Sequence, residues 1–463
     1  MQSRVLVLDR WSYQGGGENH KRDKKMGVPA YRQFNKQAKY RYRTLFGWLA
    51  LCLCFLVVVR PYMAFFAGTG GKGISKGKQI CDVSDPRSDF CNMKGEIRIH
   101  GHSSEIFLLS SSQKGLLPEN ATWKIRPYAR KGNNAAMGNV RELSLKSLLT
   151  AREQAPNCST YHKVPALVFS IGGFTGNYFH DFTDVLVPLF ITSRQFHGEV
   201  QFLITNSKSW WIDKYRPILK NLSKYEIIDF DNDDRVHCFS NMLVGLRSHK
   251  ELSIDPSRSP NGYSMYDFIK FLRSIYSLQR DFAVKIRDDA GKKPRLLIVS
   301  RRSNRAFTNV GEIQAMATSL GYEVVTSEAD TGTPLSKISR FVNTFDVMMG
   351  VHGAGLTNLV FLPTNAVLIQ VVPFGNTDWI ARTDFEEPSG DMKLRYLEYK
   401  IGEHESTLTQ QFPHDHGVLR DPFSIDNQGW SAFSSVYLEK QNVTLDVGRF
   451  KGTLLKALEL LHL

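Results

Sequence analysis

The chain has 463 residues, of which 42% are hydrophobic and 22% charged, so it is long enough for two globular domains and too apolar for a disordered protein. Its net charge of +14 is concentrated near the N-terminus. Residues 1–44 contribute +8 and residues 45–80 contribute +4, which leaves +2 for the remainder. A nucleic-acid-binding protein usually carries its basic excess on the folded domain, so we expect no nucleic-acid partner.

An apolar run follows the basic N-terminal residues. Residues 45–66 (LFGWLALCLCFLVVVRPYMAFF) are long enough to cross a bilayer. A cleaved signal peptide is disfavoured, because 44 residues precede the run and no clear cleavage site follows it. Since the positive-inside rule keeps residues 1–44 cytosolic, we predict a type II membrane protein with a cytosolic tail (1–44), a transmembrane signal anchor (45–66) and a flexible Gly/Lys-rich stem (67–80).

Two further features agree with a lumenal location for the rest of the chain. Sequons for N-glycosylation occur at Asn120, Asn157, Asn221 and Asn442. Outside the predicted span the cysteines are Cys81, Cys91, Cys158 and Cys238. An even number in an oxidising compartment predicts two disulfides, with three connectivities open. The absence of a C-x-x-C spacing disfavours a structural zinc site.

From residue 81 onward, apolar runs and helical patterns alternate. In the first half we predict strands at 167–171, 200–204 and 225–230 and a helix over 178–196. In the second half we predict strands at 295–300, 322–326, 347–351 and 366–372, with helices at 312–320 and 335–345. The pattern indicates an α/β fold of two Rossmann-like, doubly wound domains that face a cleft, residues 81–290 and 291–463, the second with a C-terminal helix.

The first candidate constellation lies on the predicted helix 178–196, after a Gly-rich loop. His180 and Asp184 are four residues apart and share one helix face, whereas Asp181 points about 100° away. A histidine or carboxylate there can take a proton from a hydroxyl group. Asp184 is the first choice for this base, His180 oriented by Asp184 is the alternative, and Asp181 is third. An ordinary capping and salt-bridging pair is the competing interpretation.

A second acidic group, Asp229 and Asp231, follows a predicted strand as Asp-x-Asp. Such a pair can hold a divalent metal against a diphosphate. It lies outside the half that carries the phosphate-type loops, so we interpret it as an acidic surface turn. We therefore expect no metal site and no essential metal.

Two loops in the second half suit a diphosphate, because each follows the carboxyl end of a predicted strand, where α/β folds bind ligands. The first (SRRSNR) offers Ser300, Arg301, Asn304 and Arg305. The second (HGAGLTN) offers His352, Gly353, Ala354, Gly355 and Asn358. Arginine forks bind phosphate oxygens, and glycines let a helix N-terminus approach them. A solvated basic loop and a structural histidine are the competing interpretations.

Three long motifs, GGFTGNYFHDFTDVLVPLF, LLIVSRRSNRAFTN and VMMGVHGAGLTNLVFLP, together with the cysteine-bearing segment ICDVSDPRSDFCNMKGEIRIHG, resemble plant members of glycosyltransferase family 61. The resemblance covers residue 80 to the C-terminus. It implies an inverting, Golgi-resident enzyme of GT-B fold that uses a UDP-sugar. We expect no cofactor. More distant members resemble the chain at His180, Asp184, Arg301, His352 and Gly353.

The subgroup that this sequence most resembles implies a pentose transferred to xylan, from UDP-xylose or from UDP-arabinofuranose. Two stretches, WWIDKYRPILKNLSKYEIIDFD and YSMYDFIKFLRSIYSLQRD, look more like the xylan β-1,2-xylosyltransferases. Xylan α-1,3-arabinofuranosyltransferases and N-glycan β-1,2-xylosyltransferases are the alternatives, and a lumenal glycan-binding protein without catalysis is the rival class. Expected partners are the Golgi membrane, xylan, and either a second copy or other xylan-synthesis enzymes.

Overall fold

The computed structural model describes residues 6–7, 80–109, 121–148, 155–288, 291–328 and 332–463. Residues 79–463 belong to one compact unit. The predicted signal anchor lies outside the described residues, as do the tail and stem apart from residues 6, 7 and 80. Among the helices that the structure describes, none combines the length and apolarity that a bilayer crossing requires.

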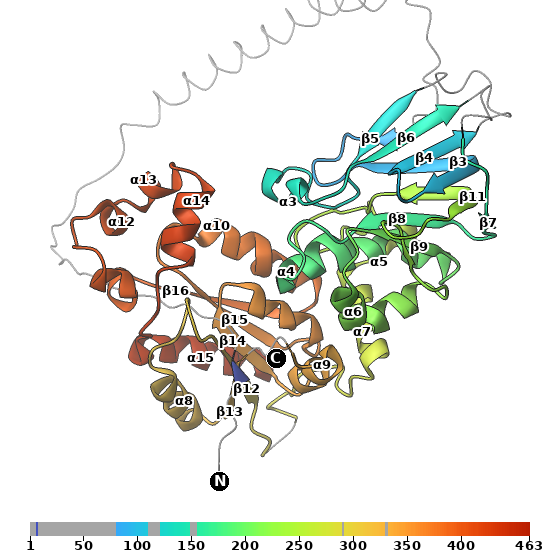
Figure 1. Ribbon diagram of the computed structural model, residues 1–463. Coiled ribbons are helices and arrows are strands. Elements are labelled where there is room, and N and C mark those ends of the chain that lie inside the picture. Colours follow the sequence, from blue (N-terminus) through green and yellow to red (C-terminus); the bar gives the residue numbers. More distant parts are fainter. Residues whose placement is uncertain (1–5, 8–79, 110–120, 149–154, 289–290, 329–331) are drawn as a thin grey trace, which may run out of the picture. The chain divides into compact units, whose positions relative to one another are not determined.

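The second half of this unit contains a six-stranded, wholly parallel sheet with the order β1-β13-β12-β14-β15-β16. Figure 1 shows helices α8 and α15 on one side of the strands and α9 on the other. The predicted parallel sheet is thus confirmed for this half. The strands are β1 (Leu6–Val7), β12 (Arg295–Ser300), β13 (Glu323–Glu328), β14 (Val347–Val351), β15 (Val367–Val372) and β16 (Arg395–Lys400).

Strand β1 belongs to the segment predicted to be cytosolic. Leu6 and Val7 pair with Ser327 and Glu328 of β13. This pairing and the predicted topology exclude one another, because a membrane would separate residues 1–44 from the folded unit. The location of the N-terminus therefore decides between them.

The first half contains a mixed sheet with the order β10-β9-β8-β11-β3-β4-β6-β5. The first four of these strands are parallel, as predicted, but β3 is antiparallel to both β11 and β4. The prediction of a doubly wound sheet is therefore wrong for residues 81–148. The physical reason is that four residues join β3 to β4, too few for the crossover that parallel strands need.

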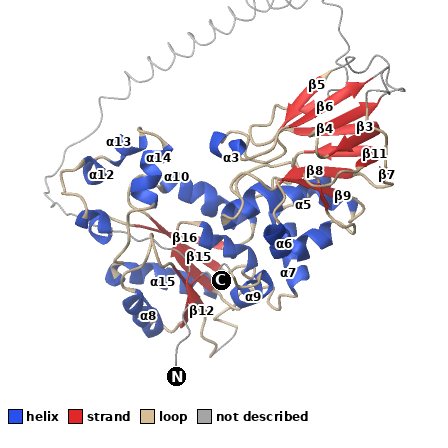
Figure 2. Cartoon of the chain, in the orientation of Figure 1, coloured by secondary structure: helices blue, strands red, loops and turns tan. Residues whose placement is uncertain are grey.

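The strands of this sheet, shown in red in Figure 2 with those of the other, are β2 (Cys81–Asp82), β3 (Phe90–His100), β4 (Glu105–Leu109), β5 (Thr122–Ile125), β6 (Leu143–Leu148), β7 (Thr160–Tyr161), β8 (Ala166–Ser170), β9 (Gln201–Thr205), β10 (Ile228–Asp229) and β11 (Val236–Val244). Its helices are α3 (Asn134–Gly138), α4 (Tyr178–His180), η3 (Asp181–Leu186), α5 (Val187–Ser193), η4 (Arg194–Phe196), α6 (Ser209–Leu222), η5 (Pro260–Gly262) and α7 (Met265–Tyr276).

The helices of the second half include the predicted C-terminal one, α15. They are α8 (Val310–Ser319), α9 (Leu335–Val342), η6 (Ala354–Phe361), α10 (Asp378–Ala381), η7 (Arg382–Glu386), α11 (Glu387–Asp391), η8 (Glu403–Glu405), η9 (Thr407–Gln410), α12 (Gly417–Arg420), α13 (Pro422–Asp426), α14 (Trp430–Phe433), η10 (Ser434–Leu438) and α15 (Val447–His462).

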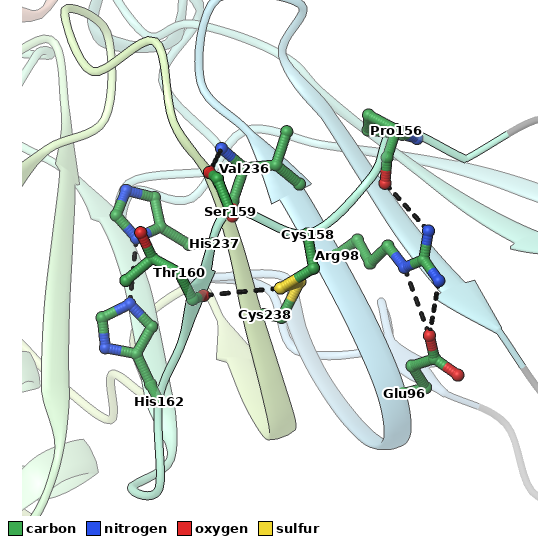
Figure 3. The surroundings of a disulfide bond; sticks show 10 residues. All are labelled: Glu96, Arg98, Pro156, Cys158, Ser159, Thr160, His162, Val236, His237 and Cys238. Atoms are coloured by element: carbon green, nitrogen blue, oxygen red, sulfur yellow. Dashed lines mark hydrogen bonds and ion pairs between the residues drawn. A yellow bond between two sulfur atoms is a disulfide. The ribbon is translucent and has the colours of Figure 1, made fainter.

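The four cysteines form the two predicted disulfides. Cys81–Cys91 joins β2 to β3, and Cys158–Cys238 ties the segment before β7 to β11. Figure 3 shows the second bond near two histidines, His162 just after β7 and His237 in β11, where Nε2 of His162 lies 2.9 Å from Nδ1 of His237. The connectivity that the sequence left open is thereby settled.

The sequons differ in their surroundings. Asn157 and Asn221 are exposed, so a glycan fits at both. Asn442 is half-buried, and its Oδ1 accepts a hydrogen bond from the backbone N–H of Ala306. Asn120 lies outside the described residues.

The two halves share one apolar core and several polar contacts. A single cluster of buried side chains includes residues of β8 and β9 as well as residues of β12, β14 and β15. The Tyr178 hydroxyl donates to Oδ1 of Asn358 at 3.1 Å. Buried Arg273 on α7 donates to the Leu362 carbonyl and to the Thr364 hydroxyl. Helix α4 is thus held directly against η6, which begins at the second candidate loop.

Candidate active site

The predicted helix 178–196 exists, but it contains a wider π-helical turn. Asn177 caps its start by accepting a hydrogen bond from the N–H of Phe179. The π turn covers Asp181–Leu186 and ends just before Pro188. Proline lacks the N–H that an unbroken α-helical ladder would need there. Such turns occur frequently at functional sites, and this one carries two of the three predicted acid–base residues.

His180 and Asp184 form the hydrogen-bonded pair that their spacing predicts. Nδ1 of His180 lies 3.0 Å from Oδ2 of Asp184. Asp184 is fully buried and also accepts hydrogen bonds from Arg130 at 2.8 Å and from the Tyr128 hydroxyl at 2.9 Å. Because a carboxylate oxygen accepts hydrogen bonds, the contact assigns Nδ1 of His180 as the donor and leaves Nε2 as the ring nitrogen that can meet a ligand.

The Gly-rich loop before this helix packs against Tyr128, the tyrosine that is hydrogen-bonded to Asp184. Gly173 has a φ of +54°, and a Cβ atom at this position would lie 2.3 Å from the ring of Tyr128. The loop therefore closes directly over the tyrosine that bonds Asp184. Only glycine combines this backbone conformation with so close an approach.

Asp181 has a structural role instead. Its buried carboxylate accepts hydrogen bonds from Nε1 of Trp211, the hydroxyl of Tyr215 and the backbone N–H of Gly176, at 2.8, 2.8 and 3.0 Å. It fastens the Gly-rich loop to α6. The geometry therefore gives it no part in proton transfer.

The two phosphate-type loops come together as predicted. Strands β12 and β14 are neighbours in the parallel sheet, so both loops leave the same edge. A Cβ atom built at Gly353 would lie 3.3 Å from Nη1 of Arg305 and 3.7 Å from Nη1 of Arg301. Gly353, with a φ of +151°, also occupies a backbone conformation that other residues rarely adopt. Two guanidinium groups thus converge on the glycine that begins η6.

The charges of these arginines are costly to hold in the folded protein. Burial and the neighbouring Arg305 lower the pKa of Arg301 to about 8. Burial lowers the pKa of Arg305 to about 10. An anion between the two groups would offset both effects. The arrangement is therefore suited to binding a phosphate or diphosphate.

His352 is a neutral imidazole held in one tautomer. Burial, together with Arg305 and Arg301, lowers the pKa of His352 to about 3. Nε2 of Gln370 donates to Nδ1 of His352 at 3.0 Å, and the hydroxyl of Tyr396 donates to Oε1 of Gln370. The proton of the imidazole is thus on Nε2, which lies 3.8 Å from Oδ2 of Asp384.

The other residues predicted to bind the donor differ in their burial and in the hydrogen bonds that they already make. Ser300 is buried at the end of β12, while Asn304, Ala354 and Gly355 are half-buried. Asn358 is buried and already bonded on both sides, because it accepts from Tyr178 and donates to the Gly355 carbonyl. We therefore assign Asn358 to joining the two halves rather than to contacting a ligand.

A cavity of about 820 Å³ opens next to these groups. His180 lines it from the first half and Asp384 from the second, whereas Asp184 and the loop arginines are not among its lining residues. His352 precedes the glycine that the arginines approach, and its Nε2 lies 3.8 Å from Asp384 in the lining of the cavity. The geometry therefore favours His180, the alternative, over Asp184 as the group that meets a ligand.

Sequence reasoning missed Asp384 and Glu251, which also line the cavity. Burial opposes ionisation of Glu251, but Arg87 and Arg130 lower its pKa to about 2. Burial and repulsion from Glu251 raise the pKa of Asp384 to about 8. One carboxyl group is therefore ionised and the other is mostly protonated at neutral pH. No motif marks Asp384, since its pKa depends on a carboxylate far away in the chain.

The acidic turn lies at the edge of the other sheet. Asp231 accepts hydrogen bonds from Arg141 at 2.6 Å, from the Thr205 hydroxyl at 2.7 Å and from the backbone N–H of Asn206 at 2.6 Å. Asp229 precedes it at the end of β10 and accepts from Asn232. These contacts agree with an acidic turn, although both residues are half-buried and not at the surface as predicted. In the described part of the chain, no group of three or more His, Cys, Asp or Glu side chains is placed to hold a metal ion.

Comparison with known proteins gives consistent matches. Residues 178–369 match the family described as Glycosyltransferase 61. An alpha-1,3-arabinosyltransferase of Oryza sativa subsp. japonica is 50% identical over 83% of this chain and 65% of its own length. A beta-1,2-xylosyltransferase of the same rice is 48% identical over 82% of this chain and 84% of its own length. A xylan glycosyltransferase of Arabidopsis thaliana is 39% identical over 81% of this chain and 78% of its own length. The chain thus spans just under two thirds of the rice arabinosyltransferase.

Proposed function

The chain belongs to glycosyltransferase family 61, and we propose that it transfers a pentosyl residue, preferably xylosyl, from a UDP-sugar to the xylan backbone with inversion. The observation that carries this proposal is the convergence of Arg301 and Arg305 on Gly353. The adjacent His352 lies 3.8 Å from Asp384, which lines a cavity that His180 lines from the opposite half. The names of the three relatives support the class of donor sugar and acceptor.

The donor would bind with its diphosphate at the two arginines and the start of η6. Each charge-assisted hydrogen bond of this kind contributes about 1.5–3 kcal/mol. Nε2–H of His352 and the protonated carboxyl of Asp384 then lie between the diphosphate and the cavity, where they can donate hydrogen bonds to the departing UDP. The positive charges take the place that a metal ion holds in other glycosyltransferases, so no metal is part of this proposal.

His180 would act as the base. Asp184 holds Nδ1–H, so Nε2 can accept the proton of the acceptor hydroxyl as it attacks the donor sugar from the face opposite UDP. Arg130 and Tyr128 hold the Asp184 carboxyl group in position by hydrogen bonds. This division of roles makes Asp184 a positioning residue.

The structural frame of the proposal is a GT-B-like fold. The half with the parallel sheet (residues 291–463) would bind the donor, and the first half (residues 81–290) would supply the base to an acceptor that also reaches the second half along the cavity. The anchor at residues 45–66 would hold the enzyme in the Golgi membrane with this unit in the lumen. The exposed sequons at Asn157 and Asn221 agree with that location.

A second candidate is transfer of arabinofuranose to the same acceptor. The identities to the arabinosyltransferase and to the xylosyltransferase, 50% and 48%, do not separate the two donors. Incubation of the detergent-solubilised full chain with xylohexaose and either UDP-xylose or UDP-arabinofuranose, followed by linkage analysis of the product, distinguishes them. Release of UDP without any transfer to xylohexaose would contradict both candidates.

A further inference from the structure

Two tryptophans stand exposed at the rim of the cavity described above. Trp379 on α10 is 49% exposed, Trp430 on α14 is 58% exposed, and both line the cavity. Large aromatic side chains normally gain stability by burial. Exposed aromatic groups gathered beside a cavity therefore indicate a ligand surface.

The two indoles pack against buried aromatic side chains. Their ring centroids lie 6.3 Å apart with the planes inclined by 71°. Both pack against the fully buried ring of Phe433, at 6.3 and 5.7 Å, and Phe433 in turn packs against buried Tyr437 at 5.7 Å. The indoles are thus held in position, as a preformed binding surface requires.

The chemistry of this surface fits a neutral sugar chain. The faces of a pyranose ring present C–H groups, which pack against the π-face of an indole, and a xylosyl ring lacks the hydroxymethyl group that would obstruct either face. The inclination of 71° suits successive rings that are turned relative to each other. The diphosphate-binding arginines are not among the residues that line the cavity. A uracil ring stacked on an indole is the competing occupant, and it would make UDP binding depend on the two tryptophans.

We propose that Trp379 and Trp430 form an acceptor subsite that binds the xylosyl units next to the one that receives the new sugar. The inference rests on the proposed function, because it takes xylan as the acceptor. It adds a determinant of chain-length preference, since a short xylo-oligomer would reach the base but would not cover both indoles.

Binding of xylohexaose and xylobiose to the full chain, measured by calorimetry without any donor, tests the subsite independently of catalysis. Trp379→Ala and Trp430→Ala should each weaken xylohexaose binding about tenfold or more, should change xylobiose binding less, and should leave UDP binding unaltered. Trp430→Phe should recover much of the affinity. The matched control is Phe423→Ala, because Phe423 is 61% exposed on neighbouring α13 but does not line the cavity.

The outcomes separate the subsite from the reaction. Failure of the native chain to bind xylohexaose, or equal binding by Trp430→Ala and Phe423→Ala, overturns the inference even if transfer to xylan is observed. Tryptophan-dependent xylohexaose binding in a chain that transfers no sugar supports the subsite and overturns the proposed reaction instead. Circular dichroism spectra confirm that each variant is folded.

Discussion

Replacement of Arg301 by glutamine should have opposite effects on stability and on donor binding. In the folded protein, burial and Arg305 lower the pKa of Arg301 from the ordinary arginine value to about 8. A base with a depressed folded pKa destabilises the native state at every pH below that value, and this cost disappears as the pH rises from about 8 towards the pKa of an arginine in the unfolded chain. At neutral pH the cost is therefore fully present.

The pKa shift sets the scale of the effect. At 1.36 kcal/mol per unit, it corresponds to an upper bound of ~6 kcal/mol. Rearrangement of water and the lost packing of the arginine stem reduce the gain, so we expect the free energy of unfolding of Arg301→Gln to rise by about 1–2 kcal/mol. The same substitution removes charge-assisted hydrogen bonds to the diphosphate, which should weaken UDP binding by about tenfold or more.

Thermal unfolding with and without UDP, together with calorimetry, measures both effects on one protein. Without UDP, Arg301→Gln should unfold at a higher temperature than the native chain, and UDP should raise that temperature less. The matched control is Arg302→Gln, since Arg302 belongs to the same loop but its side chain is 85% exposed. A variant that is less stable than the native chain, or that binds UDP as well as the control does, would refute the reasoning.

Four further outcomes are expected. His180→Gln should lower kcat by about 10²–10⁴-fold with UDP affinity unchanged, and near-native turnover would remove the base assignment. Because Asp384 ionises at about pH 8, native kcat/KM should fall as the pH rises through that value. Asp384→Asn should lack this decline, and an identical pH profile would show that Asp384 does not titrate in the reaction. Activity should survive EDTA, whereas loss restored by Mn²⁺ would assign a metal to Asp229 and Asp231. A C-terminal tag should resist protease in sealed Golgi vesicles while an N-terminal tag is cleaved; protection of both would favour the pairing of β1 with β13 over the predicted topology.

Sequence patterns placed the two loops that carry the arginines and Gly353 because their signals are local. Strands 295–300 and 347–351 were predicted with the bounds of β12 and β14, since strands buried on both faces read as continuous apolar runs. The arginines and Gly353 follow those strands directly. Their convergence required only the rule that neighbouring parallel strands end at one edge of the sheet.

The parts that sequence reasoning missed depend on contacts between distant residues. Asp384 owes its raised pKa partly to Glu251, and Trp379 meets Trp430 only in the folded chain. The choice of His180 over Asp184 as the base likewise depended on the contact between Arg130 and Asp184. Arg130 lies too far away in the sequence for helical spacing to relate it to either residue. Of the strands before residue 148, the edge strand β5 is short and only partly buried, so it carries little apolar signal.

The strand order of the mixed sheet also governs when this protein can fold during synthesis. Strand β11 lies between β8 and β3, yet it is translated after every other strand of that sheet. The strands β3 to β6 therefore have no partner among β8, β9 and β10 until residue 244 has left the ribosome. Cys158 likewise waits for a partner 80 residues later in the chain. Domains fold as units while the chain emerges. A nascent chain that pauses before β11 would therefore expose two incomplete sheet edges and an unpaired thiol. The time between synthesis of Cys158 and synthesis of β11 is thus when chaperones and disulfide isomerases would act.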